Sequence, residues 1–302
     1  IANLEHELAE AGLSIPVYWG NRNWHPYLAD ELARMRDDGV RRVAAFVTSA
    51  YDSYSGCRQY REDLARAVAE VGPGAPVIDR LRLCFDHPGF SAANADGVVG
   101  ALGDLPRDVA DAARIVFVTH SIPTAMADTS GPTGGAYVAQ HQAVAAEVAR
   151  QVAERTGVRR DHDLVYCSRS GSPRTPWLEP DVNDHLAELA EQDVPAVVLA
   201  PIGFLSDHME VAYDLDTEAM ATAAKLGIAA ARAATAGTHP DFVGTVVDLL
   251  LERAAAERGE QVTRASIGAP GPVADVCPGG CCPNPRGPMP ALCGEDAPPY
   301  PS

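Results

Sequence analysis

The sequence has few basic residues, and it lacks the long apolar runs that a membrane span requires. It contains 24 Lys and Arg against 41 Asp and Glu, so the formal net charge is −17 and the pI lies near 4.8. Nucleic-acid phosphates and anionic membranes are bound by basic surfaces, which this balance disfavours. A bilayer span takes about 20 consecutive apolar residues, and no such run occurs. The composition therefore predicts partners other than nucleic acid or a membrane.

Two further patterns are missing from the sequence. No signal peptide follows Ile1, and the Gly-rich stretch 131–135 lacks the Lys of a nucleotide-binding loop. We therefore expect a cytoplasmic, monomeric protein that needs no nucleotide. The chain also opens without Met, inside the helix-like pattern of residues 1–8, so we expect an N-terminal segment to be absent from it.

Strand-like and helix-like patterns alternate along the chain, and hydrophobic residues make up 46% of it. Buried strands are predicted at 15–19, 43–48, 77–83, 114–119, 164–168, 194–199 and near 228, and helices at 2–12, 27–38, 58–71, 137–156, 183–192 and 240–258. The rhythm occurs twice, which predicts an α/β fold of two similar doubly wound, Rossmann-like domains with parallel sheets and a cleft between them. The predicted parts are a first domain at 1–90, a second at 91–235, a C-terminal helix at 236–267 that packs back on the first domain, and a Cys-rich tail at 268–302.

Two candidate site residues follow buried strands of the second predicted domain. His120 ends the strand 114–119, and Glu210 follows the strand 194–199. Open α/β sheets bind their ligands beyond the carboxyl ends of the strands. A neutral imidazole is both a metal ligand and a base near neutral pH. If the two strands are neighbours, His120 and Glu210 face each other; the alternative is a His satisfied by a nearby carbonyl.

Glu210 is also the first of three acidic residues spaced by four. Glu210, Asp214 and Glu218 would line one face of an α-helix. Exposed like charges at that spacing repel by roughly 0.2–0.5 kcal/mol per pair. The pattern indicates either a solvated acidic surface or a carboxylate ladder that receives protons or a divalent cation.

Three of the seven cysteines lie together as Cys277, Cys281 and Cys282. In a chain without a secretory signal, such a group favours metal or cluster ligands over disulfides. An iron–sulfur cluster usually needs four thiolates, and the other four cysteines are the candidates for the fourth: Cys57, Cys84, Cys167 and Cys293. We prefer Cys57, since Cys84 and Cys167 lie in apolar strand contexts while Cys57 is in an exposed loop at a helix start. A structural zinc site or a redox thiol pair are the alternatives. Without cysteine ligation to anchor it, the Pro- and Gly-rich tail should be disordered.

Aromatic residues gather in the loops of the first predicted domain. They are Trp19, Trp24, Tyr51, Tyr54 and Tyr60. Such a group could line a flat apolar ligand pocket or form a domain interface, and we favour the interface.

Five stretches together resemble the ferrochelatases, which insert ferrous iron into a porphyrin. They are Gly20-Asn-Arg-Asn-Trp-His-Pro26, Tyr51-Asp-Ser-Tyr-Ser-Gly-Cys-Arg-Gln-Tyr60, Thr119-His-Ser-Ile-Pro123, Ser168-Arg-Ser-Gly171 with Pro176-Trp-Leu-Glu-Pro180, and Pro201-Ile-Gly-Phe-Leu-Ser-Asp-His-Met-Glu210. The resemblance runs to about residue 258. The tail resembles that of actinobacterial members, which carry a [2Fe–2S] cluster and are similar to the ferrochelatases that use coproporphyrin III.

The resemblance implies a role for each matched position. His120 and Glu210 would bind the Fe²⁺ substrate and take protons, and Tyr60 would contact the porphyrin. Asp214 and Glu218 would continue an acidic path or form a second divalent-cation site. Cys57, Cys277, Cys281 and Cys282 would hold the cluster, with Cys293 or Cys167 as alternatives. The rival functions are a protoporphyrin IX ferrochelatase, a chelatase for cobalt or nickel, and a porphyrin-binding module without catalysis.

Overall fold

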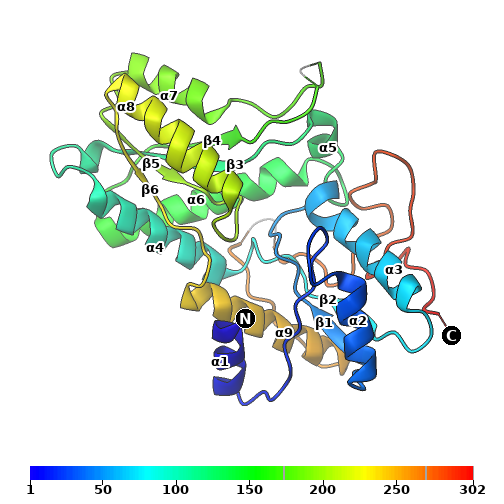
Figure 1. Cartoon of the computed structure of the whole chain (residues 1–302). Helices are drawn as coiled ribbons and strands as arrows, with labels where there is room; N and C mark the ends of the chain where they lie inside the picture. Colours follow the sequence, from blue (N-terminus) through cyan, green and yellow to red (C-terminus); the bar gives the residue numbers. More distant parts are fainter. Residues whose placement is uncertain (173, 269–270, 302) are drawn as a thin grey trace.

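The computed structural model describes residues 1–172, 174–268 and 271–301, which form two parallel β-sheets with helices packed against them (Figure 1). The larger sheet has the strand order β4-β3-β5-β6, and every neighbouring pair is parallel. Its strands are β3 (Arg114–His120), β4 (His162–Cys167), β5 (Ala196–Ala200) and β6 (Ala229–Arg232). The smaller sheet pairs β1 (Arg42–Ala45) with β2 (Val77–Arg80). The predicted α/β class with parallel sheets is confirmed.

The helices follow the predicted pattern closely. The α-helices are α1 (Ala2–Glu10), α2 (Leu28–Asp37), α3 (Gln59–Val71), α4 (Pro88–Asp104), α5 (Thr124–Asp128), α6 (Ala136–Thr156), α7 (Val182–Glu191), α8 (Met220–Leu226) and α9 (Pro240–Glu257). Local chemistry fixes several ends: the His87 ring accepts from the Gly89 N–H ahead of α4, and α6 ends at Gly157 with φ of 72°. Such a left-handed C-terminal residue favours glycine. None of the helices in the described ranges combines the length and apolar character needed to cross a membrane.

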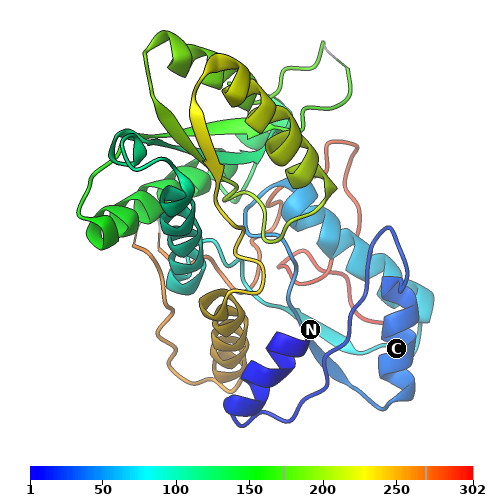
Figure 2. The same cartoon turned by 60° about the vertical axis from the view of Figure 1, so that its left-hand side comes forward.

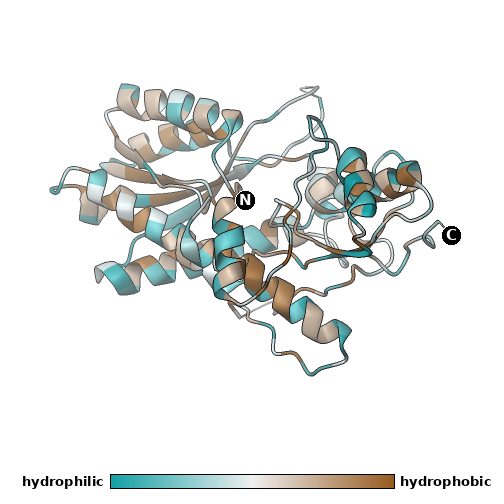
Figure 3. Cartoon of the chain, turned by 60° about the horizontal axis from the view of Figure 1, so that its bottom comes forward, coloured by the Kyte–Doolittle hydropathy of each residue, from teal (hydrophilic) through white to brown (hydrophobic). Residues whose placement is uncertain are grey.

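The larger sheet separates two hydrophobic layers, because successive strand residues point to opposite faces. On one face, Ile115 and Phe117 of β3 pack with α4 and α6. On the other face, Val116 and Val118 pack with α7, α8 and the helical segment 211–219 that precedes α8. All five residues of β5 are buried, as is typical of a parallel strand covered on both sides. Figure 3 shows these strands as a brown, apolar layer between helices whose outer faces are teal.

The smaller sheet is covered by α2 and α3, whose Leu32, Met35, Leu64 and Val68 pack with Ile78 of β2. Helix α9 lies beside α1 and α4 (Figure 2). It is also joined to the smaller sheet by ion pairs from Arg253 to Asp79 at 2.6 Å and from Arg42 to Glu257 at 2.6 Å. Helix α9 therefore connects α1 and α4 to the smaller sheet.

Two predictions about local structure, the strand at 15–19 and the α-helix after residue 210, are wrong. Residues 15–19 form no strand; Ile15 and Trp19 are about half exposed, and no neighbouring strand supplies backbone partners. Helix α8 is preceded by a π-helix, η3 (Val211–Ala219), where the spacing of the acidic residues predicted an α-helix. A second π-helix, η1 (Tyr54–Arg58), precedes α3 in a stretch predicted as a loop up to Cys57. Shorter elements, α5 and the 3₁₀-turn η2 (Ala110–Ala112), have no clear signal in the sequence.

Candidate active site

Strands β3 and β5 are neighbours, so the residues that follow them lie close together. The Nε2 atom of His120 is 3.8 Å from Oε2 of Glu210, and the two side chains are 33% and 55% exposed. The loop between β5 and Glu210 lies against β3 because Gly203 has no side chain: a Cβ there would stand 2.1 Å from Oγ1 of Thr119. The Gly203 N–H instead donates to the Val118 carbonyl at 3.2 Å. The pair is thus held by the backbone while its reactive atoms remain open to solvent.

Hydrogen bonds orient the ring and backbone of His120. Its Nδ1 donates to the carbonyl oxygen of Ser121, which leaves the Nε2 lone pair toward Glu210. Its own carbonyl accepts from the Tyr137 hydroxyl at 2.8 Å. A ring in this tautomer can bind a metal or accept a proton at Nε2.

A buried polar group that the sequence analysis missed lies behind His120. Oγ1 of Thr119 lies 3.1 Å from the Tyr137 hydroxyl and 2.8 Å from Nε2 of His141. The His141 ring stacks on Tyr51 with 3.5 Å between ring centroids. Burial lowers the pKa of His141 to about 3, so this ring is neutral at physiological pH. The four-residue spacing of Tyr137 and His141 on α6 was the signal that could have identified them.

The three acidic residues do not form the α-helical ladder that their spacing predicted. Glu210 caps η3, Asp214 lies inside it, and Glu218 is near its end. A π-helix bonds i to i+5, so side chains four apart are offset around the axis. Asp214 accepts a hydrogen bond from Ser168 at the end of β4, whereas Glu218 raises the pKa of the exposed Tyr213 beside it. The three carboxylates therefore lie in different local environments.

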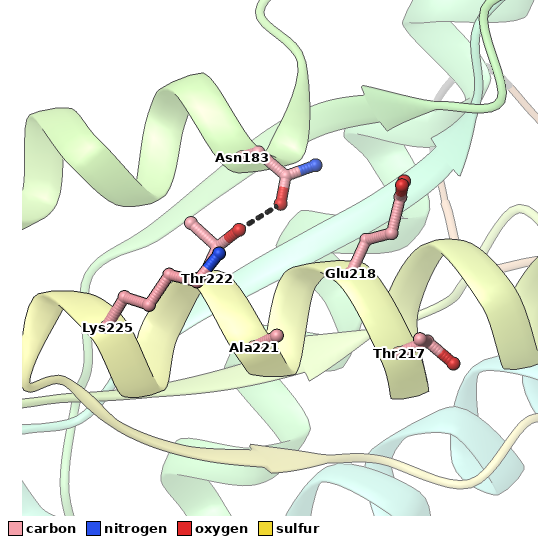
Figure 4. Close-up of a pocket in the computed structure, with 6 residues that line it drawn as sticks. All are labelled: Asn183, Thr217, Glu218, Ala221, Thr222 and Lys225. Carbon is pink, nitrogen blue, oxygen red and sulfur yellow. Dashed lines mark hydrogen bonds between the residues drawn. The ribbon is translucent and has the colours of Figure 1, made fainter.

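Glu218 borders an open surface pocket of about 340 Å³ (Figure 4). The pocket is lined by Asn183, Thr217, Glu218, Ala221, Thr222 and Lys225. The Thr222 hydroxyl donates to Oδ1 of Asn183 at 2.7 Å, and Glu218 and Lys225 stand at opposite ends of the pocket (Figure 4). The pocket therefore lies between α7 and the helical segment that runs from η3 into α8.

The aromatic residues of the first domain divide into two groups. Tyr51 and Tyr54 are buried; the Tyr51 hydroxyl donates to the Ile202 carbonyl at 3.0 Å, which joins the loop after β1 to the loop after β5. Tyr51 thus links residues of the two predicted domains, as the interface interpretation requires. Trp19 and Trp24 are exposed.

Tyr60, the predicted porphyrin contact, is partly buried at the start of α3. The guanidinium carbon of Arg22 lies 3.9 Å from its ring centroid, a cation–π arrangement. Arg22 also donates to Oε1 of Gln59 at 3.2 Å. The stretch around Arg22 and the start of α3 are therefore tied together.

Four cysteine sulfurs come together beside the smaller sheet. Cys57 and Cys277 lie 4.0 Å apart, sulfur to sulfur, and Cys281 and Cys282 lie 3.8 Å apart. Cys57, Cys281 and Cys282 form a buried cluster, with the partly buried Cys277 packed against it. The expectation that Cys57 is exposed is wrong, since the tail covers it and leaves it 1% exposed.

The other three cysteines lie elsewhere. Cys293 donates to the Ile78 carbonyl at 3.3 Å. Cys84 and Cys167 belong to the two hydrophobic layers, and burial raises the pKa of each to about 12. Both are packed among apolar side chains, outside the cluster of Cys57, Cys281 and Cys282.

Nitrogen donors surround the four sulfurs. The Gly131 N–H donates to Cys282 at 3.1 Å, and Nη1 of Arg80 lies 3.0 Å from the Cys57 sulfur and 3.5 Å from the Cys277 sulfur. Three of the four sulfurs thus accept from N–H groups, and four thiols in one place are the ligand set that an iron–sulfur cluster usually needs. Four thiols would also suit a structural zinc site.

The tail is anchored by more than its cysteines. Asp296 accepts from Arg58 at 2.7 Å and from Arg61 at 2.9 Å, and Leu292 enters the core beside Ile78. Gly294 is required at the crossing, because a Cβ there would stand 1.8 Å from Nη2 of Arg61. Residues 271–301 therefore form a docked layer; 269–270 and 302 of the predicted tail lie outside the described residues.

Comparison with known proteins places this arrangement in a family. The Ferrochelatase family model matches residues 1–254. The chain is 55% identical to the coproporphyrin III ferrochelatase of Streptomyces griseus over 98% of its own length and 80% of the relative's. It is 46% identical to the ferrochelatase of Rhodopirellula baltica, over 93% and 76%. Sequence similarity of this extent covers every candidate residue up to Glu218.

Solved structures show the same fold at much lower identity. SirB from Bacillus subtilis with Fe³⁺ superposes with a TM-score of 0.55 at 15% identity, covering 85% of this chain and 89% of SirB. The sirohydrochlorin chelatase SirB in complex with cobalt gives 0.54 at 16% identity, over 85% and 88%. These likenesses concern the chelatase-type fold alone. Taken with the match over residues 1–254, the sequence identities show that the chain belongs to the ferrochelatase family.

Proposed function

We propose that this chain inserts Fe²⁺ into coproporphyrin III to give coprohaem III, as a cytoplasmic enzyme of haem biosynthesis. The observation that carries the proposal is the pair of His120 and Glu210, 3.8 Å apart and partly exposed at the carboxyl end of the parallel strands. The relatives named coproporphyrin III ferrochelatase support the choice of porphyrin.

The reaction exchanges one Fe²⁺ for the two pyrrole N–H protons of the porphyrin. His120 accepts a proton at Nε2, since its Nδ1 is engaged with Ser121. Glu210 balances the charge of the resulting imidazolium. Asp214 and Glu218 then pass protons toward solvent or bind a second divalent cation, and Tyr60 contacts the porphyrin. Tyr137 and Thr119 hold the backbone of His120 throughout.

We also propose that Cys57, Cys277, Cys281 and Cys282 hold a [2Fe–2S] cluster. The convergence of four sulfurs and the N–H groups of Gly131 and Arg80 support it. Such a cluster would bond to four thiolates, and it would supply a centre that takes up one electron. Because three ligands belong to the tail, the cluster stabilises the docking of that tail on the smaller sheet.

The test is anaerobic metal insertion, followed by the porphyrin absorption spectrum. With Fe²⁺, we expect coproporphyrin III to be converted faster than protoporphyrin IX. A preference for protoporphyrin IX would contradict the porphyrin assignment, and a preference for cobalt or nickel would contradict the metal assignment. Binding without conversion would make the chain a porphyrin-binding module.

A matched pair of variants tests the site. His120→Ala is expected to abolish insertion and leave the fold intact, while His6→Ala, on the exposed face of α1, is expected to leave insertion unchanged. Retained turnover in His120→Ala would refute the role given to His120.

A further inference from the structure

Arg80 is the last residue of β2, and its side chain is buried at 4% relative exposure. A guanidinium is always protonated in proteins, so this is a permanent buried cation. Such a charge is strongly destabilising unless it is paired. The partners of Arg80 therefore indicate what the site is built to hold.

Those partners are sulfur atoms. Nη1 donates to Cys57 at 3.0 Å and to Cys277 at 3.5 Å. Among the described residues, no carboxylate lies within ion-pair distance of Arg80, and its Nε and Nη2 atoms are buried without a hydrogen-bond partner. The guanidinium thus carries unused donors beside the cysteine group.

Other buried arginines nearby are neutralised in the usual way. Arg61 is fully buried and pairs with Asp296 at 2.9 Å. Arg82 pairs with Asp86 at 2.5 Å and Glu252 at 2.6 Å. The contrast leaves the cysteine sulfurs in direct contact, and the buried Asp52 at longer range, as the partners of the Arg80 charge.

We propose that Arg80 is a positioning residue that neutralises the [2Fe–2S] cluster, donates hydrogen bonds to its sulfurs and sets its reduction potential. This inference rests on the cluster assignment proposed above. Four thiolates and two sulfides give the cluster a net negative charge, which a cation in contact with two of the ligands offsets. Hydrogen bonds to cluster sulfurs and nearby charge are the main protein contributions to cluster potentials. The free Nε and Nη2 donors are available to the inorganic sulfides.

Reduction adds one electron to the cluster and one negative charge, with no bond made or broken. Arg80 stabilises this reduced form more than the oxidised form, so removing its charge lowers the reduction potential. The same removal weakens retention of the cluster, because the thiolates then repel one another without compensation.

The experiment compares the full wild-type chain with Arg80→Gln, Arg80→Lys and Arg42→Gln. Arg42→Gln is the control for net charge, since Arg42 lies on the neighbouring strand, is 48% exposed and pairs with Asp79 and Glu257. Circular dichroism reports the fold. Bound iron and acid-labile sulfide report the cluster, and a spectroelectrochemical titration with dithionite as the electron donor reports its potential.

We expect Arg80→Gln to lower the one-electron reduction equilibrium constant by about tenfold, which is about 59 mV. Arg80→Lys keeps the charge and should stay nearer the wild-type potential, and Arg42→Gln should not change it. A folded Arg80→Gln chain that assembles no cluster, beside a loaded Arg42→Gln chain, also supports the proposal. If Arg80→Gln does not fold, the reduction potential of Arg80→Lys is the test. A tenfold loss in the reduction equilibrium constant of that variant, which keeps the charge, contradicts the proposal.

Two results overturn the inference in different ways. An unshifted potential in cluster-loaded Arg80→Gln, or an equal shift in Arg42→Gln, refutes the role of Arg80 alone. A wild-type chain without iron and sulfide refutes the cluster assignment itself, whether or not the chain inserts iron into the porphyrin.

Discussion

Replacement of Tyr137 by Phe tests whether the buried polar group positions the metal site. The change removes one oxygen atom, which donates to the His120 carbonyl at 2.8 Å and lies 3.1 Å from Oγ1 of Thr119. It leaves the ring in place against Tyr51 and His141. A buried group that loses its partner costs about 1–3 kcal/mol, so we expect a decrease of that size in the free energy of unfolding.

The effect on turnover should exceed the effect on the fold. If His120 shifts when its carbonyl is released, kcat for iron insertion should fall by about tenfold, equivalent to about 1.4 kcal/mol of barrier, while KM for the porphyrin changes little. The assay is anaerobic insertion at saturating Fe²⁺, paired with urea unfolding of the same preparation.

Tyr166→Phe is the matched control, because it removes a hydroxyl from a buried tyrosine whose Cα pairs with that of Thr119 in the sheet. It should leave kcat unchanged. The reasoning is refuted if Tyr137→Phe keeps wild-type kcat, or if Tyr166→Phe loses as much.

Three other changes probe separate parts of the molecule. His185 lies 3.1 Å from Asp163, whose hydrogen bond outweighs burial and raises the pKa of His185. The stability that His185 contributes is complete below the unfolded pKa of about 6.5 and is lost as the pH rises through the folded pKa. The unfolding free energy lost in His185→Gln, measured in urea, should therefore be larger at about pH 6 than at about pH 8, and an equal loss at both would contradict this account. Gly203→Ala should displace the loop that carries Glu210, because its Cβ would stand 2.1 Å from Thr119, and a wild-type insertion rate would contradict this account. Asp296→Ala removes two ion pairs with buried arginines, so limited proteolysis should cut the tail sooner than in wild type, and equal cleavage rates would show that the tail is held by other contacts.

The sequence was informative where pattern and chemistry agree. Apolar runs located every strand of the larger sheet, since buried parallel strands are apolar on both faces. The pairing of His120 with Glu210 followed from strand adjacency, because neighbouring parallel strands end at the same edge. Cys57 was preferred over the other candidates because it lies in a loop at a helix start, and its sulfur does lie with those of the tail cysteines.

The remainder depended on tertiary contacts that a sequence pattern does not encode. The π-helices η1 and η3 have the same composition as α-helices, so the offset of Asp214 from Glu210 was not visible. Arg80 reads as an ordinary end of an edge strand until the tail covers it. Thr119 and His141 are joined only when α6 packs on β3.

The separation of Cys57 from Cys277 has a consequence for biosynthesis. The two sulfurs meet although 220 positions separate them in the chain. At ~5–20 residues per second, a ribosome needs about 10–45 s to make the intervening segment. During that interval, Arg61 and Arg80 lack the tail that buries them, and the smaller sheet lacks one of its covering layers. The half of the molecule that is made first is therefore completed last, and the nascent chain must stay unaggregated with that surface open until residues 277–300 arrive.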